Sequence, residues 1–177
     1  MFLRALPRPR PGRVASLSSC SSSSTAAAAT QVLKVGDVLR LSRRFSEADV
    51  LAYSKVSGDA NPVHFDADFA RGFAGFRDPV VHGMLVASLF PTIIASHLPG
   101  AIYISQTLQF KLPVYVGDEI LAEVQPVNVR ENKKRYMYAQ ETFMGAKFLT
   151  KCFMVGGEPL VLDGEATAIL PTLALNS

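Results

Sequence analysis

Residues 84–96 read Met-Leu-Val-Ala-Ser-Leu-Phe-Pro-Thr-Ile-Ile-Ala-Ser, a long and almost uninterrupted apolar stretch. Apolar side chains would stand on nearly every side of a helix drawn through it, which is typical of a helix buried on most of its surface. Pro91 has no N–H group to donate, so we expect a kink or an interruption near it. The sequence therefore predicts one long buried helix, ending at Pro99-Gly100, as the centre of the fold.

The chain after this helix changes to the pattern of β-strands. Segments rich in β-branched and aromatic residues alternate with turn residues. We expect strands at 101–110, 119–129, 135–143, 147–155 and 165–170. The expected turns are at Gly117-Asp118, Asn132-Lys133, Gly145, Gly156-Gly157 and Asp163-Gly164. A long apolar helix followed by an antiparallel meander predicts an α+β fold in which the sheet wraps around the helix.

The chain before the helix predicts one strand and two shorter helices. A first strand is expected at 33–46. Ser46 and Asp49 have the spacing of a capping box, and Ser57-Gly58 is expected to end the helix that they begin. Asp66 is expected to cap a further short helix.

The run Gly58-Asp59-Ala60-Asn61-Pro62-Val63-His64 carries the side chains that point to chemistry. Pro62 cannot continue a helix and pushes Asn61 toward the extended region, so the run is a stiff turn. It holds a carboxylate, Asp59, and an imidazole, His64, which can converge on one water molecule. That pair suits the addition or removal of water by general acid–base catalysis. The structural alternative is that Asp59 and Asn61 only hydrogen-bond to the backbone of an ordinary turn.

A second run, Pro79-Val80-Val81-His82-Gly83-Met84, leads into the apolar helix. An N–H group at the start of a helix has no acceptor within it, and the helix dipole favours negative charge there. Gly83 is therefore a candidate donor to an oxyanion, although it could simply allow tight helix packing. Asn61 and His82 are supporting candidates, Asn61 by orienting the turn or the water and His82 by gating the pocket or capping the helix.

A longer pattern extends these two runs and resembles a known family. Nine positions stand at the spacing of the signature of the MaoC-like, type 2 enoyl-thioester hydratases, and the likeness covers about residues 36–170. The nine positions are Tyr53, Ser57, Gly58, Asp59, Asn61, Pro62, Val63, His64 and Ala70. The further matching runs are Val81-His82-Gly83-Met84-Leu85, Ser105-Gln106, Phe110 and Pro113-Val114-Tyr115-Val116-Gly117-Asp118. Within that family the chain most resembles the mitochondrial type 2 dehydratases of 3-hydroxyacyl thioesters.

The resemblance implies a hot-dog fold and a reaction. A (3R)-3-hydroxyacyl thioester, carried on acyl carrier protein or on coenzyme A, would lose water reversibly to give the trans-2-enoyl thioester in mitochondrial fatty acid synthesis. Asp59 and His64 would flank the departing water, one taking the α-proton and the other protonating the hydroxyl group. The resemblance also implies a homodimer, and it implies no cofactor.

Other functions remain open from the sequence. The same chemistry could act on coenzyme A thioesters in β-oxidation. A hot-dog thioesterase would hydrolyse the thioester, but the complete Asp-x-Asn-Pro-Val-His run argues against it. A non-catalytic acyl-thioester-binding subunit is the alternative from outside the enzymes. A metal site at His64, Asp66 and Asp68 is disfavoured, because nothing else completes a ligand set at zinc spacing.

Charge and composition divide the chain into a leader and a body. The first 36 residues contain no acid but include Arg4, Arg8, Arg10 and Arg13, with a Ser- and Ala-rich tract after them. Without these four arginines the net charge falls from +3 to about −1, so the basic balance does not indicate a nucleic-acid-binding face. The composition predicts an organelle transit peptide over residues 1–30, followed by a single domain over residues 31–177. The early arginines and the family resemblance together favour the mitochondrial matrix over a plastid.

Two remaining features limit the environment of the protein. No apolar run reaches the roughly 18–20 residues that span a bilayer, so no membrane insertion is expected. Only Cys20 and Cys152 are present, which argues against a disulfide framework. We expect Cys152 to be a small buried apolar residue and not a nucleophile.

Overall fold

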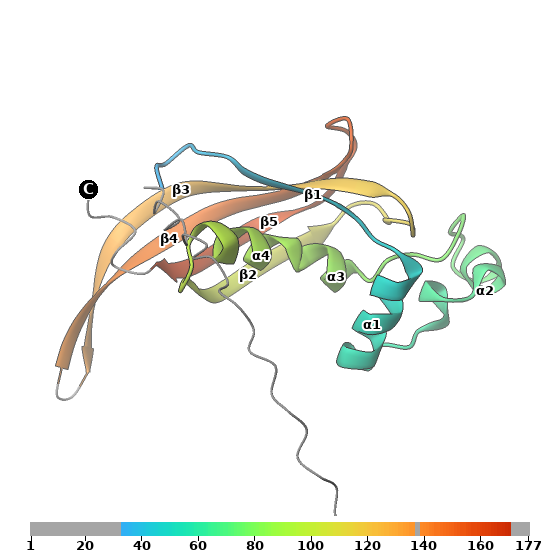
Figure 1. The fold of residues 1–177 in the computed structure, drawn as a ribbon, viewed down its shortest axis with the longest axis horizontal. Helices are drawn as coiled ribbons and strands as arrows, with labels where there is room; N and C mark the ends of the chain where they lie inside the picture. The colour runs from blue at the N-terminus through green and yellow to red at the C-terminus, as the bar shows by residue number, and fades with distance from the viewer. Residues whose placement is uncertain (1–32, 137–138, 171–177) are drawn as a thin grey trace, which may run out of the picture.

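The computed structural model describes residues 33–136 and 139–170, so the expected transit peptide of residues 1–30 lies outside the described residues. A curved five-stranded antiparallel sheet wraps around two consecutive helices, α3 and α4, and helices α1 and α2 lie beyond one end of the sheet (Figure 1). The predicted α+β class is confirmed. In chain order the elements are β1 (Leu39–Arg44), α1 (Glu47–Ser57), the 3-10 helix η1 (Pro62–His64), α2 (Ala67–Gly72), α3 (Gly83–Ala87), α4 (Leu89–His97), β2 (Ile102–Phe110), β3 (Glu119–Tyr136), β4 (Ala139–Met154) and β5 (Leu160–Leu170).

Local hydrogen bonds fix both ends of α1 as the sequence predicts. The Ser46 hydroxyl accepts the Asp49 N–H at 3.3 Å, and the Asp49 carboxylate accepts the Ser46 N–H at 2.8 Å, which completes the capping box. These bonds from Ser46, with Arg43 nearby, lower the pKa of the Asp49 carboxyl group. Gly58 ends the helix with a φ of 79°, in the left-handed region that favours glycine. Asp59 therefore follows directly after a firmly capped helix.

The apolar segment forms two helices where one long helix was predicted. Helices α3 and α4 are separated at Ser88, and Pro91 explains the break. Pro91 cannot donate to the carbonyl of Ala87, four residues earlier, and its ring crowds that carbonyl. The interruption expected near Pro91 thus falls about one turn before it. In the part of the chain that the structure describes, no helix is long and apolar enough to cross a membrane.

The strands lie in the order β1-β3-β4-β5-β2, with β1 and β2 at the two edges. Strands β3 and β4 pair over their whole length, from Ile120 opposite Met154 to Tyr136 opposite Ala139. They extend past the other strands at the end of the sheet opposite α1 and α2 (Figure 1). Strand β2, which follows the helices in sequence, lies at an edge and pairs with β5.

Several turns predicted from the sequence are wrong, because the residues lie inside strands. Asn132-Lys133 continues β3, opposite Phe143 and Thr142, and Gly145 continues β4, opposite Arg130. The separate strand predicted at 135–143 is therefore the end of β3 and the start of β4. Asp163-Gly164 lies within β5, and a Cβ atom at Gly164 would lie 1.8 Å from the Thr107 carbonyl oxygen. Glycine is required there by the close approach of β2, and not by a turn.

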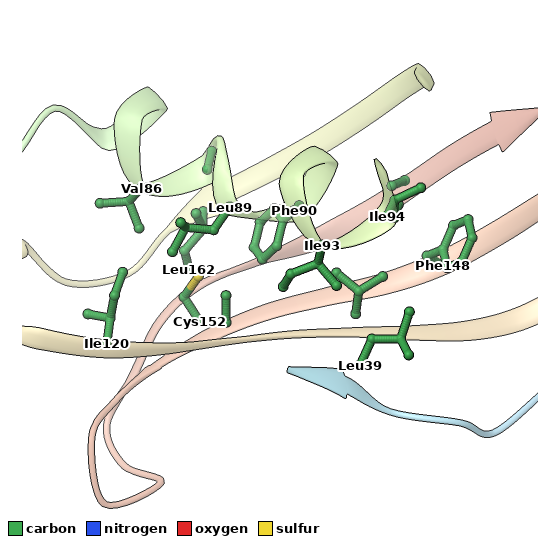
Figure 2. Close-up of a cluster of buried hydrophobic side chains, with 14 of the residues drawn as sticks. Leu39, Val86, Leu89, Phe90, Ile93, Ile94, Ile120, Phe148, Cys152 and Leu162 are labelled. Carbon is green, nitrogen blue, oxygen red and sulfur yellow. The ribbon is translucent and has the colours of Figure 1, made fainter. Parts of the chain in front are cut away.

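The hydrophobic core lies between the concave face of the sheet and the two central helices. Figure 2 shows side chains from α3 and α4 directed toward those of the strands. Phe90, Ile93 and Ile94 of α4 are almost fully buried, as is Phe148 of β4. Cys152 lies in the same cluster, and burial raises the pKa of its thiol to about 12. The prediction of a buried, apolar Cys152 is confirmed.

Candidate active site

The two polar runs of the sequence meet at one cavity of about 660 Å³. Asp59 and His64 of the first run and His82 and Gly83 of the second all line it. The rest of its wall is mainly apolar, with contributions from the end of α1, the stretch that follows β2, and β5. The lining residues are Tyr53, Ser57, Asp59, Val63, His64, Phe76, Val80, Val81, His82, Gly83, Met84, Val86, Phe110, Lys111, Leu112, Pro113, Val114, Val161 and Leu162.

The carboxylate of Asp59 and the ring of His64 face each other on this wall. His64 Nε2 lies 3.7 Å from Asp59 Oδ2. That distance exceeds a direct hydrogen bond, but both atoms can lie within hydrogen-bond distance of one oxygen atom between them. The side chain of His64 is 10% exposed and that of Asp59 is 51% exposed. The imidazole is thus held by the protein, and the carboxylate is open to the cavity and to solvent.

A backbone carbonyl determines which nitrogen of His64 is available. His64 Nδ1 lies 2.7 Å from the carbonyl oxygen of Val80, which can only accept a hydrogen bond. Nδ1 must therefore carry a proton and donate it to this bond. In the neutral ring the lone pair then lies on Nε2, the atom that faces Asp59. His64 can accept a proton from the cavity at Nε2 and return it from the same atom.

His82 connects the two halves of the acid–base pair. Its ring is 2% exposed and lies against the His64 ring, with centroids 3.7 Å apart and planes 24° apart. His82 Nε2 lies 3.0 Å from the backbone carbonyl oxygen of Asp59 and so must donate to it. Its other nitrogen, Nδ1, is buried without a hydrogen-bond partner among the residues that the structure describes. His82 is also the N-cap residue of α3, but no side-chain hydrogen bond accompanies that position.

Asn61 organises the turn and does not line the cavity. Its side-chain oxygen accepts the N–H of Val63 at 3.3 Å and so caps η1. Its own N–H donates to Asp59 Oδ1 at 3.2 Å. Of the two roles predicted for Asn61, the structure favours orienting the turn, and with it the Asp59 carboxylate.

Gly83 is the first residue of α3, so its N–H has no acceptor within that helix. The ring of Phe110 covers the glycine, and a Cβ atom at this position would lie 2.7 Å from Phe110 Cε1. A larger residue would therefore displace Phe110. Close packing accounts for the glycine by itself, and an oxyanion role for its N–H is compatible with the same geometry.

The side chains of Asp59, His64 and His82 also form the kind of cluster that could hold a metal ion, with one ligand atom of each within 4.8 Å of the others. The stacking of the two rings works against it. Each lone pair lies in the plane of its own ring, and two stacked, nearly parallel rings 3.7 Å apart do not direct their lone pairs at one tetrahedral centre. The metal site considered at His64, Asp66 and Asp68 is not assembled either, because Asp66 caps α2 by accepting the N–H groups of Asp68 and Phe69.

The sequence and fold have clear counterparts among known proteins. A family model for the MaoC-like domain matches residues 26–143. The chain belongs to the MaoC-like domain family. The mitochondrial 3-hydroxyacyl-(acyl-carrier-protein) dehydratase of Solanum lycopersicum is 57% identical over 152 residues, which is 86% of each chain. The (R)-specific enoyl-CoA hydratase of Aeromonas caviae is 46% identical over 143 residues, covering 80% of this chain and 98% of that one.

Solved structures give the same result for the architecture. The (R)-hydratase from A. caviae involved in PHA biosynthesis superposes with a TM-score of 0.68 at 45% identity, covering 80% of this chain and 99% of that chain. A Mycobacterium tuberculosis protein described as a double hot-dog fold gives a TM-score of 0.65 at 21% identity, over 78% of this chain and 42% of that one. The MaoC-like chain therefore has the hot-dog fold that its sequence predicts.

Sequence reasoning missed the backbone groups that hold this MaoC-like site together. The carbonyl of Val80 fixes the His64 ring, and the carbonyl of Asp59 fixes the His82 ring. Every residue has a carbonyl, so no side-chain pattern marks these two. Phe110 and Gly83 are 27 positions apart in the sequence, so no local sequence pattern predicts their contact.

The Val80 hydrogen bond gives a spectroscopic prediction. Neutral His64 should be protonated at Nδ1, because only that tautomer can donate to the carbonyl oxygen. Two-dimensional ¹⁵N–¹H correlation spectra of the ¹⁵N-labelled protein, with His64→Gln to assign the signals, should show the Nδ1-H pattern for this ring. An Nε2-H pattern would mean that the nitrogen facing Asp59 is not the one available to accept a proton.

Proposed function

We propose that this MaoC-like protein is a hydro-lyase that reversibly dehydrates (3R)-3-hydroxyacyl thioesters to trans-2-enoyl thioesters. The observation that carries the proposal is the pair of Asp59 Oδ2 and His64 Nε2, 3.7 Å apart on the wall of a mainly apolar cavity. An apolar cavity suits an acyl chain, and the pair suits the transfer of protons around one water molecule. The relatives at 57% and 46% identity, named as a dehydratase and a hydratase, support the same chemistry.

The reaction needs two proton transfers. In dehydration, one of Asp59 and His64 takes the α-proton and the other donates a proton to the β-hydroxyl group, which leaves as water. The electron pair of the broken C–H bond forms the new double bond. His64 Nε2 and Asp59 Oδ2 are close enough for the released water to contact both, so it can return the proton from the base to the acid.

The α-proton becomes acidic only when the thioester carbonyl can accept negative charge. We assign that task to the N–H of Gly83, which starts α3 and lines the cavity. Phe110 lies over the glycine and helps to exclude water on that side. A preorganised donor in a dry site can stabilise the transition state by about 3–4 kcal/mol.

Asn61 and His82 act in this scheme as positioning residues. Asn61 holds the turn through the Val63 N–H, and its own N–H fixes one oxygen of Asp59. His82 holds the Asp59 backbone and presents a flat surface to the His64 ring. Loss of either residue should therefore misplace the acid–base pair without removing it.

Turnover of crotonyl thioesters tests the reaction and the site together. Wild-type protein should hydrate crotonyl thioesters to the 3R alcohol on acyl carrier protein, on coenzyme A or on both. Asp59→Asn and His64→Gln should fold normally and each lose about two to four powers of ten in kcat, since each removes a proton-transfer group. Chiral analysis of the product and steady-state rates on both carriers are the measurements.

Two outcomes would contradict this assignment. Retained activity in both variants would make the residues structural, and a folded wild-type protein without activity on either carrier would favour a non-catalytic acyl-thioester-binding subunit.

His82→Phe keeps a flat ring but cannot donate to Asp59. It should lower kcat with little change in KM, and it should shift the ¹⁵N signals of His64, which a remote structural role would leave unchanged.

The relatives also guide the choice of carrier and compartment. We favour acyl-carrier-protein substrates in mitochondrial fatty acid synthesis, because the name of the relative at 57% identity contains both 'acyl-carrier-protein' and 'mitochondrial'. An R-specific enoyl-CoA hydratase of β-oxidation is the alternative, supported by the relative at 46% identity. The arginine-rich, acid-free residues 1–30 would act as the transit peptide of a matrix protein.

A reporter fusion tests the leader. Residues 1–35 fused to a fluorescent protein should direct it to mitochondria, since the segment is basic and contains no acid. Replacing Arg4, Arg8, Arg10 and Arg13 by glutamine should abolish import. A diffuse cytosolic signal, or a plastid signal, from the unmodified fusion would contradict the proposal.

We also propose that the protein is a homodimer that pairs through strand β2. This strand lies at a sheet edge and exposes large apolar side chains, among them Ile102 and Ile104. An exposed apolar edge strand is a template for pairing with another strand. Phe110 and Met84 are also more than half exposed although they line the cavity, so a second copy along β2 would shield that side.

A charge on the edge strand tests the dimer. Ile104→Lys should convert the protein to a monomer at micromolar concentration, because a lysine on an edge opposes strand pairing. Val155→Lys is the matched control, because Val155 lies in the β4–β5 connection and is similarly exposed (53% against 56% for Ile104). The molecular mass of this variant in solution should remain that of a dimer. Light scattering that gives a monomer for the wild-type protein would overturn the proposal.

A further inference from the structure

Lys111 is the one side chain with a permanent positive charge among the described residues that line the cavity. Asp59 is the one carboxylate on the same wall. The acid–base chemistry needs Asp59, His64 and a backbone N–H, so it gives Lys111 no task. A charged side chain on a mainly apolar wall calls for a binding role.

The fold places Lys111 directly after the last residue of β2. Its backbone N–H donates to the Val161 carbonyl oxygen at 2.8 Å, so the base of the side chain is fixed. The ammonium group lies 2.6 Å from Gln109 Oε1 and 3.6 Å from Asp163 Oδ1. The Lys111 and Asp163 side chains are 41% and 31% exposed, and such an ion pair contributes little. The ammonium can therefore leave these partners for a stronger anion.

A short stretch of chain connects Lys111 to the segment that carries His82. The carbonyl oxygen of Val114, three residues further along, accepts a hydrogen bond from the N–H of Val81, which precedes His82. Three residues of chain separate Lys111 from that point by at most about 10 Å, and the flexible four-carbon stem extends the reach of the ammonium. Lys111 thus lines the same cavity as the Asp59–His64 pair, from the stretch of chain that follows β2.

We propose that Lys111 binds the 4′-phosphate of a phosphopantetheine arm. The inference rests on the proposed function, which requires an acyl thioester in the cavity. In such substrates two amide groups and a branched alcohol separate the sulfur from the phosphate, so the phosphate lies at the cavity mouth when the thioester reaches Gly83. Acyl carrier protein and coenzyme A share this group, and one lysine would serve both.

Arg77 is the other cation near the mouth, and it is less suited to this role. It lines a separate hollow of about 310 Å³, which shares Leu112 and Pro113 with the main cavity. Its guanidinium group lies 4.2 Å from the centroid of the Tyr115 ring and 3.0 Å from Asp118 Oδ1. Asp118 is 16% exposed, so removing Arg77 would leave a largely buried carboxylate without its charge partner.

The test varies the arm and the lysine in the full-length protein. Crotonyl thioesters of pantetheine, 4′-phosphopantetheine, coenzyme A and holo-acyl carrier protein are compared for wild type, Lys111→Gln and Lys111→Arg. Lys111→Gln should raise KM about tenfold for the three phosphate-bearing substrates with kcat unchanged, and should not affect the pantetheine thioester, which has no phosphate. Lys111→Arg should retain most of the affinity. Lys147→Gln is the matched control, because this lysine on β4 is similarly exposed (48%), is paired with Glu165 and does not line the cavity.

Each other outcome overturns the inference. Equal losses on pantetheine would mean that Lys111 shapes the cavity, and no loss on any substrate would mean that it binds nothing. A loss confined to acyl carrier protein would place the contact on the carrier surface and not on the phosphate. Calorimetric binding of the unreactive butyryl thioesters of pantetheine and phosphopantetheine gives the same comparison without turnover, so a failure of the proposed reaction remains distinguishable from a failure at Lys111.

Discussion

The hydrogen bond from His64 Nδ1 to the Val80 carbonyl oxygen is the interaction on which the arrangement of the site depends. It joins the stiff turn after α1 to the segment that leads into α3, two pieces of chain that share no regular secondary structure. The backbone strengthens the connection, since the Val80 N–H donates to the Val63 carbonyl oxygen at 3.1 Å. The N–H of the next residue, Val81, donates to the carbonyl oxygen of Val114 at 2.7 Å. One short segment therefore fixes the His64 ring, the stacked His82 and the start of α3.

The buried helices give this segment a rigid support. Phe90, Ile93 and Ile94 anchor α4 to the sheet, so its position is fixed by close packing against β3 and β1. Pro91 breaks the helical hydrogen-bond ladder and separates α3 from α4 at Ser88. As a result α3 is a short separate element, and Gly83 starts it at the cavity wall. The apolar sequence that determines the fold also sets where the site can form.

The sequence predicts the parts that depend on neighbouring residues. The capping box at Ser46 and Asp49, the glycine stop at Gly58 and the cap at Asp66 all depend on contacts within a few positions, and all three are observed. The turns expected at Gly145 and Asp163-Gly164 fail because pairing with distant strands decides the conformation there. The same limit applies to the site. Asp59 and His64 are recognisable as a pair, but the tautomer of His64 is set by a carbonyl 16 residues away.

Strand β2 links chemistry to the edge of the sheet. Phe110, its last residue, covers Gly83 on one side and is still 54% exposed. Lys111 follows at the cavity wall, and the chain then returns along Val114 to the segment that holds His82. Any chain that pairs with β2 would therefore contact a residue that itself touches the start of α3. Pairing at this edge would restrict Phe110 and exclude water from the Gly83 N–H, because a half-exposed ring loses its freedom when its open face is buried. In the proposed dimer, subunit association and the proposed oxyanion role of the Gly83 N–H would thus depend on one aromatic side chain, that of Phe110.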